Sequence, residues 1–507
     1  MADDQKIVLK DVEETFPYIG QFGRFQIRLL VILTLMKIPQ SAFILMMYFV
    51  AMNPSWKCAE NSVECSWNHT FSSDDQLRCN MSREAWQYTE SKTFSLVTEF
   101  DLVCGKEWII YLCSSVYFLG WAIGSLVFGN IGDLFGRRKA LFPSFIAMLV
   151  VGGLSVLSPT PLVFAASRFL IGFFNAGMIM SLYVLATEFV SSKHRPVPTL
   201  IFSFLFPIGS ILLACAAYLI KDWKVLLLIF SLPFLPLMLC WRLVPESIRW
   251  LHSRGRLSKV EKLISKIAES NGRKLSKPLT LVEKDISFHE GKANLVELFR
   301  KRPIRNLSLI LGLSWFALNL VYYGASLAAS DLGVGDPYVN FILSLVIEMP
   351  SIVISYVGCY RYGRKKTVSY TTILGAIFCL AVAFLPNVGN LSKARLVCGI
   401  SGKFFLTVPY WSILIWTVEL YPTYIRSTGL GYSCVVGRIG GVAAPWVAKA
   451  LLPFHFAAPF LAMGIIGLMS GITMLWLPET KDLTETDLNN KLIYNGKKKD
   501  LMLLDKK

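Results

Sequence analysis

Long apolar segments constrain the fold of this chain more than any other feature of its sequence. About twelve runs of roughly 20 residues recur along 507 residues, of which 54% are hydrophobic and 17% charged. A helix of about 20 apolar residues crosses the hydrocarbon core of a bilayer, where only helices and closed barrels satisfy the backbone. The sequence therefore predicts an all-α, multi-pass membrane protein. The runs are 27–49, 108–130, 140–158, 161–188, 197–220, 223–243, 304–328, 338–358, 367–386, 394–417, 427–449 and 455–477.

Most basic residues lie at the ends of these runs, next to polar loops. The formal net charge is +17, and basic clusters occur at 136–139, 191–195 and 361–366, in the loop 244–305 and in the tail at 496–500. Short loops rich in Lys and Arg mark the cytoplasmic side, and the same charges contact anionic lipid headgroups. We therefore expect these charges to face the lipid bilayer and not a nucleic acid. The polar, acidic start lacks the apolar core of a cleavable signal peptide, so the first run is expected to stay in the membrane with the N-terminus in the cytoplasm. With about twelve spans, the C-terminus is expected on the same side.

The polar segment between the first two runs has the features of an extracellular loop. Four of the eleven cysteines lie in it, Cys58, Cys65, Cys79 and Cys104, together with the glycosylation sequons at Asn68 and Asn80. Four cysteines in one exposed loop indicate two disulfides on an oxidising side, with three pairings possible. Metal ligation is the alternative, but the spacings match no common zinc pattern.

Three short motifs occur twice in the same order. "GNIGDLFGRRKALF" begins at Gly129 and "GCYRYGRKKTVSY" at Gly358. Glu188 and Arg195 recur as Glu419 and Arg426, with the same interval between the two copies of each residue. "VPESIRWL" after the sixth run corresponds to "LPETKDL" after the twelfth. Three motifs in register indicate two halves of six helices related by duplication. Parallel six-helix halves with a substrate site between them are the plan of the major facilitator fold.

The predicted organisation follows from these observations. We expect a cytoplasmic N-terminus (1–26), a first half (27–243) that includes an extracellular loop (50–107), a cytoplasmic central loop (244–303), a second half (304–477) and a cytoplasmic tail (478–507). Within the central loop, "SKVEKLISKIAES" has apolar residues on one face of a helix.

These motifs resemble the organic ion transporters of solute carrier family 22, within the major facilitator superfamily. The resemblance rests on "YIGQFGRFQ", "GDLFGRRK", "ASRFLIGFF", "PESIRWL", "GRLSKVEKLISKIAESNG", "SWFALNLVYYG" and "ELYPTYIR", and it covers nearly the whole chain. The family contains carriers of organic cations, organic anions, and carnitine or other zwitterions. The resemblance therefore implies a transporter but does not choose the substrate.

Two charges inside the runs are the strongest candidates for substrate recognition. Glu348 lies in "LVIEMPSIV" and Arg438 in "CVVGRIGGVAAPW". Charged residues at membrane depth are costly and usually line a pathway or pair within the bundle. The resemblance implies an aspartate at the position of Arg438 in cation carriers and an arginine in anion or zwitterion carriers, and an arginine fork matches a carboxylate. An acid and a base in one cavity suit a zwitterion, whereas a structural ion pair is the alternative for each residue.

Two lysines complicate this interpretation. Lys37 lies about ten residues into the first run, where the resembling family is apolar. If it faces the cavity it favours anions, and if it pairs with an acid it is structural. Lys403 has a family counterpart and is expected to be structural, with Arg168 as its equivalent in the first half.

Aromatic and gating residues complete the predicted site. The resemblance places Trp315, Tyr322, Tyr410 and Trp411 at cavity positions, although aromatic residues in membrane helices often only pack. Charge networks at the repeated motifs are expected to close the cytoplasmic side during the transport cycle. The predicted gating residues are Asp133, Arg137, Arg138, Arg168, Glu188, Arg195, Glu419 and Arg426.

The predicted function is transport of small organic ions across the plasma membrane by alternating access. Zwitterions such as carnitine are the preferred cargo, with Glu348 and Arg438 as opposite-charge contacts. The alternatives are organic anions, recognised by Arg438 and Lys37, organic cations, or a sensor without transport. A co-transported or exchanged ion is compatible with the sequence. No nucleophile elbow, zinc motif or phosphate-binding glycine loop points to an enzyme or to a cofactor.

Overall fold

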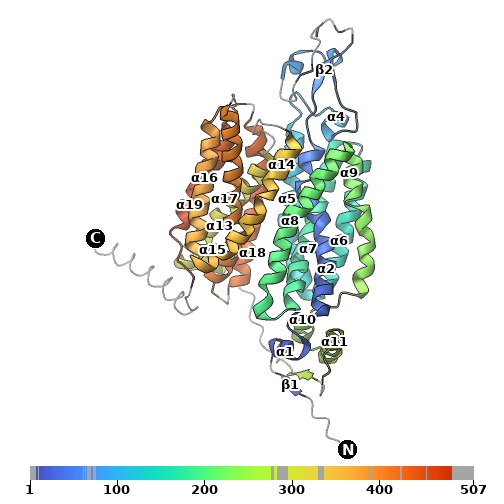
Figure 1. Cartoon of the computed structure of the whole chain (residues 1–507), viewed down its shortest axis with the longest axis vertical. Helices are drawn as coiled ribbons and strands as arrows, with labels where there is room; N and C mark the ends of the chain where they lie inside the picture. The colour runs from blue at the N-terminus through green and yellow to red at the C-terminus, as the bar shows by residue number, and fades with distance from the viewer. Residues whose placement is uncertain are drawn as a thin grey trace, which may run out of the picture.

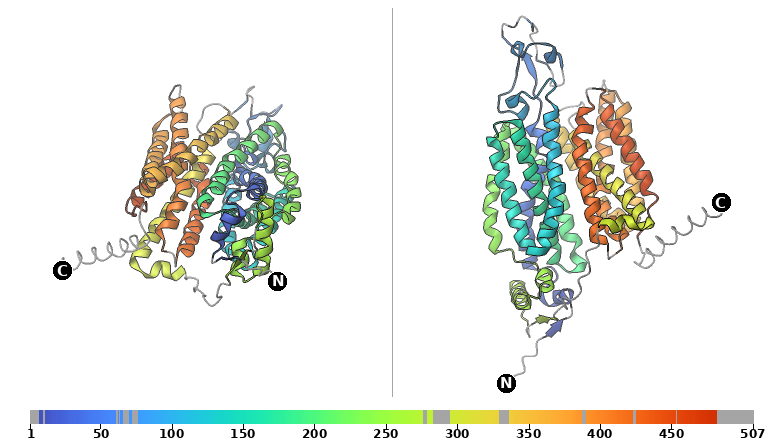
Figure 2. Two further views of the ribbon diagram at one scale, coloured as in Figure 1. Left: turned by 60° about the horizontal axis from the view of Figure 1, so that its bottom comes forward. Right: turned by 180° about the vertical axis from the view of Figure 1, so that it is seen from behind.

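The computed structural model describes residues 7–9, 11–60, 62, 64–65, 70–71, 76–275, 279–282, 295–328, 336–386, 390–422, 425–452 and 454–481. Most of these residues are helical, and the long helices form two bundles that lie side by side (Figure 1, Figure 2). The first bundle ends at residue 242 and the second begins at residue 302. This is the major facilitator architecture predicted from the repeated motifs.

The helices follow the predicted apolar runs. The first bundle is built from α2 (Arg24–Leu45) continued by α3 (Met47–Val50), α5 (Trp108–Phe135), α6 (Arg137–Leu154) with η4 (Ser155–Leu157), α7 (Pro161–Glu188), η5 (Ser192–His194) with α8 (Pro196–Ile220), and α9 (Trp223–Ile229) with η6 (Leu232–Arg242). The second is built from α13 (Arg302–Leu327), α14 (Pro337–Val346) with α15 (Glu348–Arg361), α16 (Arg364–Phe384), α17 (Asn390–Leu420), α18 (Arg426–Pro445) with η8 (Trp446–Ala450), and α19 (Ala458–Met474).

Within the described residues, ten helical segments are long and apolar enough to cross a membrane. The other two predicted runs form α18 and α19. The first of these contains Arg438 and several glycines, and the second has only 17 residues. The criteria of length and composition therefore miss both helices as membrane spans. Each of them nevertheless packs into the second bundle against α13.

Small residues let helices in the first bundle approach closely. A Cβ atom on Gly120 of α5 would lie 2.1 Å from the carbonyl oxygen of Phe169 on α7, and one on Gly172 of α7 would lie 2.0 Å from that of Tyr117. Without a hydrophobic driving force between helices in lipid, such close backbone packing is a main source of association. Helices α5 and α7 therefore form a tightly packed pair in the first bundle.

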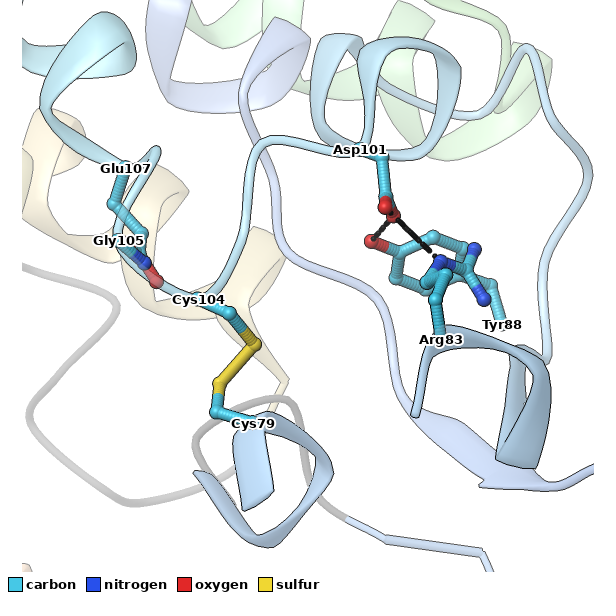
Figure 3. The surroundings of a disulfide bond; sticks show 7 residues. All are labelled: Cys79, Arg83, Tyr88, Asp101, Cys104, Gly105 and Glu107. Atoms are coloured by element: carbon cyan, nitrogen blue, oxygen red, sulfur yellow. Dashed lines mark hydrogen bonds and ion pairs between the residues drawn. A yellow bond between two sulfur atoms is a disulfide. The ribbon is translucent and has the colours of Figure 1, made fainter. Parts of the chain in front are cut away.

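One end of the first bundle carries the segment 51–107, and we call this side of both bundles the loop end (Figure 1). The segment contains η2 (Gln76–Asn80), η3 (Arg83–Ala85), α4 (Leu96–Phe100) and the antiparallel strands β2 (Trp56–Cys58) and β3 (Trp86–Tyr88). Disulfides join Cys58 to Cys65 and Cys79 to Cys104, which settles the pairing that the sequence left open. Figure 3 shows the second disulfide beside Asp101, which accepts hydrogen bonds from Arg83 and Tyr88.

The two predicted sequons fall differently within this segment. Asn80 is exposed at the end of η2, whereas Asn68 lies outside the described residues. An exposed asparagine in a disulfide-bonded loop is compatible with glycosylation, which stays a prediction for both positions.

The opposite end carries the repeated motifs, and we call it the motif end. Here β1 (Ile7–Leu9) pairs in parallel with β4 (Leu279–Leu281), and η1 (Val12–Thr15), α1 (Phe16–Ile19), α10 (Ile248–Ser253) and α11 (Leu257–Ser270) pack beneath the first bundle (Figure 1). The predicted amphipathic helix of the central loop is confirmed as α11, which buries Val260, Ile264 and Ile267. Beneath the second bundle, α12 (Leu295–Arg300) packs against α13 and α18.

Candidate functional site

Aromatic side chains from both bundles meet at the middle of the structure. The rings of Tyr322 on α13 and Tyr410 on α17 stack with their centroids 4.1 Å apart. The hydroxyls of Tyr323 and Tyr410 lie 3.0 Å apart. From the first bundle, Phe118 on α5 packs 4.6 Å from the ring of Tyr323, and Phe206 on α8 lies 6.4 Å from that of Tyr322. The predicted residues Tyr322 and Tyr410 thus belong to one cluster, which also contains Tyr323.

Arg438 lies against this cluster from α18 and is partly exposed. Its guanidinium carbon is 3.6 Å from the centre of the Trp121 ring on α5, which is a cation–π contact across the two bundles. Nη1 donates to Asn319 Oδ1 at 3.2 Å and to the Tyr323 hydroxyl at 3.3 Å. Tyr410 also interacts with the guanidinium. An arginine has five N–H donors, so these contacts leave part of the fork for another acceptor.

Glu348 has different partners from those that a zwitterion site requires. Its side chain is fully buried, with Oε1 3.0 Å from Lys403 Nζ and Oε2 accepting from the Tyr322 hydroxyl at 2.9 Å. Lys403 also donates to Ser344 Oγ at 3.2 Å. The sequence left open a structural ion pair for Glu348, and in the structure its partner is Lys403. The carboxylate is therefore neutralised inside the second bundle and is not presented as an open contact.

Lys37 faces the interior from the middle of α2. It is 4% exposed, its Nζ donates to Gln40 Oε1 at 2.6 Å, and it lies 5.7 Å from the centre of the Tyr183 ring. The amide nitrogen of Gln40 is buried and has no partner in the described part of the chain. Lys37 and Arg438 come from different bundles, on α2 and α18. Within the described residues no carboxylate contacts either basic side chain, so neither is neutralised by an ion pair.

The remaining predicted aromatic residues behave differently from each other. Trp315 is 7% exposed, packs with the core of the second bundle, and donates from Nε1 to Thr417 Oγ1 at 2.9 Å. Trp411 lies 5.6 Å from Tyr410 and 6.5 Å from Phe206, and its Nε1 has no partner among the described residues. Trp411 therefore offers an unused donor beside the cluster, whereas Trp315 has the contacts of a packing residue.

The repeated motifs form matching charge networks at the motif end. Glu246 accepts from the backbone N–H groups of Arg137 and Arg138, at 2.8 and 3.1 Å. Glu479 accepts from those of Arg364 and Lys365, at 2.8 and 3.2 Å. Glu246 thus caps the N-terminus of α6, and Glu479 caps that of α16. Unpaired N–H groups at a helix N-terminus favour a negative charge.

The arginines that open these helices pair with the predicted glutamates. Arg137 Nε lies 3.5 Å from Glu188 Oε2, and Arg364 Nη2 lies 2.9 Å from Glu419 Oε1. Arg137 also pairs with Asp133 at 2.9 Å. Each of these ion pairs joins residues of a single bundle, so both bundles repeat the same local arrangement.

The other predicted gating residues lie apart from these pairs. Arg138 packs over the Trp241 ring at 4.4 Å, and Arg426 Nε donates to the carbonyl oxygen of Tyr421 at 3.2 Å. Arg195 pairs with Glu13 at 3.4 Å. Arg168 is 1% exposed in the first bundle, where Nη1 donates to the carbonyl oxygen of Phe43 at 3.1 Å. Its position in the core of a single bundle does not bring it to the networks of the motif end.

Sequence reasoning missed several residues of both regions. The capping role of Glu246 and Glu479 was visible in the repeat of "PES" and "PET", which was used only as evidence of duplication. Arg364 occupies the repeat position of Arg137, so the same comparison would have nominated it. Trp121 and Asn319 have no such signal, because only the three-dimensional packing brings α5 and α13 to Arg438.

The described part of the chain offers no arrangement for a metal ion. No group of three or more His, Cys, Asp or Glu residues comes together there. The aromatic cluster instead brings together ring faces, hydrogen-bond donors and the positive charge of Arg438.

The two bundles touch mainly toward the loop end. Tyr48 and Phe49 of α3 pack against Phe341 of α14, with ring centroids 4.4 and 5.0 Å apart. Trp446 donates to Ser115 Oγ at 2.9 Å, and Ser115 donates to the carbonyl oxygen of Val442 at 2.7 Å. These contacts close the interior on the loop side of the aromatic cluster.

Comparisons with known proteins found a matching family model and several relatives. A family model described as sugar (and other) transporter matches residues 32–492. Solute carrier family 22 member 6-A of Xenopus laevis is 32% identical over 445 residues, 85% of this chain and 79% of the relative. Organic anion transporter 3 of Sus scrofa is 33% identical over 414 residues, 80% of this chain and 75% of the relative. An organic cation transporter protein of Drosophila melanogaster is 29% identical over 517 residues, 94% and 93% of the two chains.

Solved structures share the fold at lower identity. A partially occluded, inward-open conformation of the xylose transporter XylE from E. coli has a TM-score of 0.65 at 15% identity, covering 91% of this chain and 99% of that chain. Another inward-open structure of the same transporter has a TM-score of 0.63. At this identity the likeness concerns the fold alone.

Proposed function

The chain belongs to solute carrier family 22 of the major facilitator superfamily, a family of multi-pass organic ion transporters, and on that premise we propose that it carries organic anions. Arg438 is the residue that binds the negative group. Alternating access of an interior site to the two sides of the membrane moves the cargo, as the two halves rock against each other. The plasma membrane is the proposed location, with the loop end outside and both termini in the cytoplasm.

One observation carries the choice of an anion. Arg438 is a partly exposed cation with no carboxylate partner in the described residues, while Glu348, which contacts Tyr322 of the aromatic cluster, is neutralised by Lys403. Lys37 adds a second basic side chain without a carboxylate partner in the described residues, from the other bundle. Unpaired buried charge is costly, and an anionic substrate removes that cost where a cation would increase it.

The surroundings of Arg438 favour an anion with an aromatic or apolar body. Trp121 covers one face of the guanidinium, and Tyr323 and Tyr410 lie at its edge. Aromatic rings pair in offset-stacked or edge-to-face arrangements with centroids about 4.5–7 Å apart. An aromatic ring of the substrate would pair in this way with these side chains. The N–H of Trp411 supplies a further donor for a polar group of the cargo.

Zwitterionic cargo remains the second candidate because of Glu348. That reading requires the glutamate to leave Lys403 and Tyr322 when a betaine or ammonium group binds. Breaking a fully buried pair leaves Lys403 unpaired, which costs about 3–5 kcal/mol. A zwitterion must recover this cost, whereas a plain anion does not.

Purified protein in liposomes tests the proposal directly. Uptake of three labelled tracers is compared: phenylacetate as an aromatic anion, tetraethylammonium as a cation, and carnitine as a zwitterion. We expect phenylacetate to be the best substrate. Arg438→Gln should lower its kcat/KM by about 10- to 100-fold, because a hydrogen bond to a charged group is worth about 1.5–3 kcal/mol. Arg438→Lys should restore part of the loss.

A matched control removes a cation that does not face the interior. Arg361→Gln, at the exposed end of α15, should leave uptake of all three tracers unchanged. Preferential carnitine uptake by the wild type, reduced selectively by Glu348→Gln, would replace the anion proposal by the zwitterion one. Preferential tetraethylammonium uptake that is unaffected by Arg438→Gln would reject both.

A further inference from the structure

We propose that Glu13, in the segment ahead of the first span, is a positioning residue of the gate. It holds Arg195 and Arg249 at the motif end, so that the ends of three spans turn with the first bundle as one body. This inference rests on the proposed transport function, because it concerns how the two halves rock. It assigns a role to a segment that the repeated motifs do not include.

The contacts of Glu13 join three separate pieces of chain. Its Oε2 pairs with Arg249 of α10 and lies 3.4 Å from Arg195 Nη2, while its Oε1 accepts from the backbone N–H of Ser192. Ser192 and Arg195 connect α7 to α8, and α10 follows the last segment of the first bundle. Burial alone would raise the pKa of Glu13, but the hydrogen bonds from Ser192 and Arg249 outweigh it and lower the pKa. The carboxylate is therefore charged at neutral pH.

The segment that carries Glu13 is itself firmly attached. Asn271, at the end of α11, donates to the carbonyl oxygen of Ile19 at 2.7 Å and accepts from the N–H of Phe25 at 2.9 Å. Arg273 donates to the carbonyl oxygen of Pro17 at 2.7 Å. Strand β1 pairs with β4 of the central loop, and Val12, Phe16 and Ile19 are buried. The segment that carries Glu13 is therefore fixed in place next to α1, beneath the first bundle (Figure 1).

Comparison of the two halves shows why the first needs an extra acid. Glu246 and Glu479 cap equivalent helices, and Arg137 and Arg364 pair with equivalent glutamates. After the cap the repeat breaks down: the first half continues Ser247-Ile248-Arg249 and the second Thr480-Lys481-Asp482. The first half therefore has a cation where the second has an acid. Glu13 supplies the missing negative charge from outside the duplicated unit.

The position of Glu13 separates its effect from substrate binding. Arg438 lies 12 residues beyond the start of α18 at the motif end, which is about 18 Å along a helix. Solvent and salt screen charges over such a distance. Loss of Glu13 should therefore change how fast the bundles rock, which sets turnover in many carriers and enzymes, and not how tightly the site binds.

Kinetics in liposomes, normalised to the amount of folded protein, test this role. Glu13→Gln should lower the maximal rate of phenylacetate uptake by about tenfold, the factor expected when pairs worth about 1.4 kcal/mol are lost, with KM changed less than twofold. Glu13→Asp keeps the charge and should recover most of the rate. Glu13→Gln combined with Arg249→Gln removes the excess cation as well and should recover part of it.

The matched control is Asp11→Asn, which removes a negative charge from the same segment. Asp11 is exposed and makes no side-chain cap contact, so the rate should equal that of the wild type. A merely structural role for Glu13 would lower the amount of folded protein or its melting temperature while leaving the rate per folded molecule intact. That result, or a changed KM with an intact maximal rate, would overturn the proposal.

A second measurement does not depend on the cargo. Nitroxide labels at Lys139 of α6 and Lys366 of α16, both exposed at the motif end, report the distance between the halves in a chain whose exposed Cys215 is serine. Glu13→Gln should shift the distribution of distances, and Asp11→Asn should not. If wild-type protein transports none of the three tracers, the proposed function fails, while an unchanged distribution in Glu13→Gln refutes the role of Glu13 itself.

Discussion

A carboxylate at membrane depth is tolerable only where a cation and a hydrogen-bond donor neutralise it, and Glu348 has both. Lys403 on α17 pairs with Glu348, and the Tyr322 hydroxyl on α13 donates a hydrogen bond to the same carboxylate. Arg438 has no such acid and is covered by an aromatic ring instead. The two residues look alike in sequence, one charge in each apolar run, but they differ in their surroundings. Glu348 is neutralised within the protein, whereas under the proposed function Arg438 binds the ligand.

The buried pair makes a prediction about stability. Lys403→Met leaves Glu348 charged and unpaired, so the free energy of unfolding should fall by about 3–5 kcal/mol. The double variant Glu348→Gln with Lys403→Met removes both charges and should recover most of the loss. Denaturant titration of the protein in lipid bicelles measures both values.

The exposed lysine Lys262 on α11 provides the control, since Lys262→Met should change stability by less than about 0.5 kcal/mol. Equal losses in the single and double variants would mean that the cost of losing Lys403 does not come from an unpaired charge on Glu348.

Sequence reasoning identified the unusual charges but could not pair them. Periodicity and hydropathy place Glu348, Lys403 and Arg438 inside spans, because each lies far from a run's end. Which spans face each other depends on side-chain packing between helices, and the repeated motifs do not encode it. For this reason the sequence left the partner of Glu348 open, and it did not indicate which aromatic residue lies over Arg438.

Among the elements, the turns between the second and third spans of each half are the most constrained. Gly136 and Gly363 precede α6 and α16 with φ of 108° and 99°, a region that side chains with a Cβ rarely adopt. A Cβ at these positions would lie 2.3 Å from Glu246 Oε2 and 2.4 Å from Glu479 Oε2. Each glycine therefore makes room for the carboxylate that caps the next helix.

Alanine at either glycine should uncap a helix. We expect Gly136→Ala and Gly363→Ala each to destabilise the protein by about 1.5–4 kcal/mol, as backbone strain adds about 1–2 kcal/mol to a lost cap of about 0.5–2 kcal/mol. Thermal unfolding followed by tryptophan fluorescence measures the effect. Gly431→Ala on α18 is the control, because a Cβ there meets nothing within 4 Å and helix propensity predicts a gain of up to about 1 kcal/mol. A neutral Gly136→Ala would show that Glu246 does not need this turn.

The elements themselves were predictable to different degrees. The apolar runs gave the spans because crossing a bilayer demands length and hydropathy, both of which are local properties. The break at Ile347 between α14 and α15 and the strand pair β1–β4 were not predicted. The strand pair joins residues 272 positions apart in the register Ile7–Leu279. Such pairing depends on tertiary contact, and three-residue strands leave almost no pattern in a sequence.

At the scale of the whole molecule, the two bundles behave as separate bodies joined toward one end. The network of each repeated motif lies within its own bundle, whereas aromatic contacts cross between the bundles at the loop end. This arrangement corresponds to a carrier closed at the loop end. Transport by alternating access requires these aromatic contacts to open in every cycle.

Fixing the loop end should therefore stop transport. Phe49 of α3 and Tyr338 of α14 stack with ring centroids 5.3 Å apart, one from each bundle. A chain with Phe49→Cys and Tyr338→Cys, in which Cys215 is serine, is treated with a short bismaleimide and assayed for phenylacetate uptake in liposomes. We expect more than about 90% loss of uptake, because a covalent bridge prevents the opening step that sets turnover. Each single cysteine variant, treated with the same reagent, should keep most of its activity. Full uptake by the cross-linked double variant would mean that the bundles do not separate here, and the opening would then have to involve helices within one bundle.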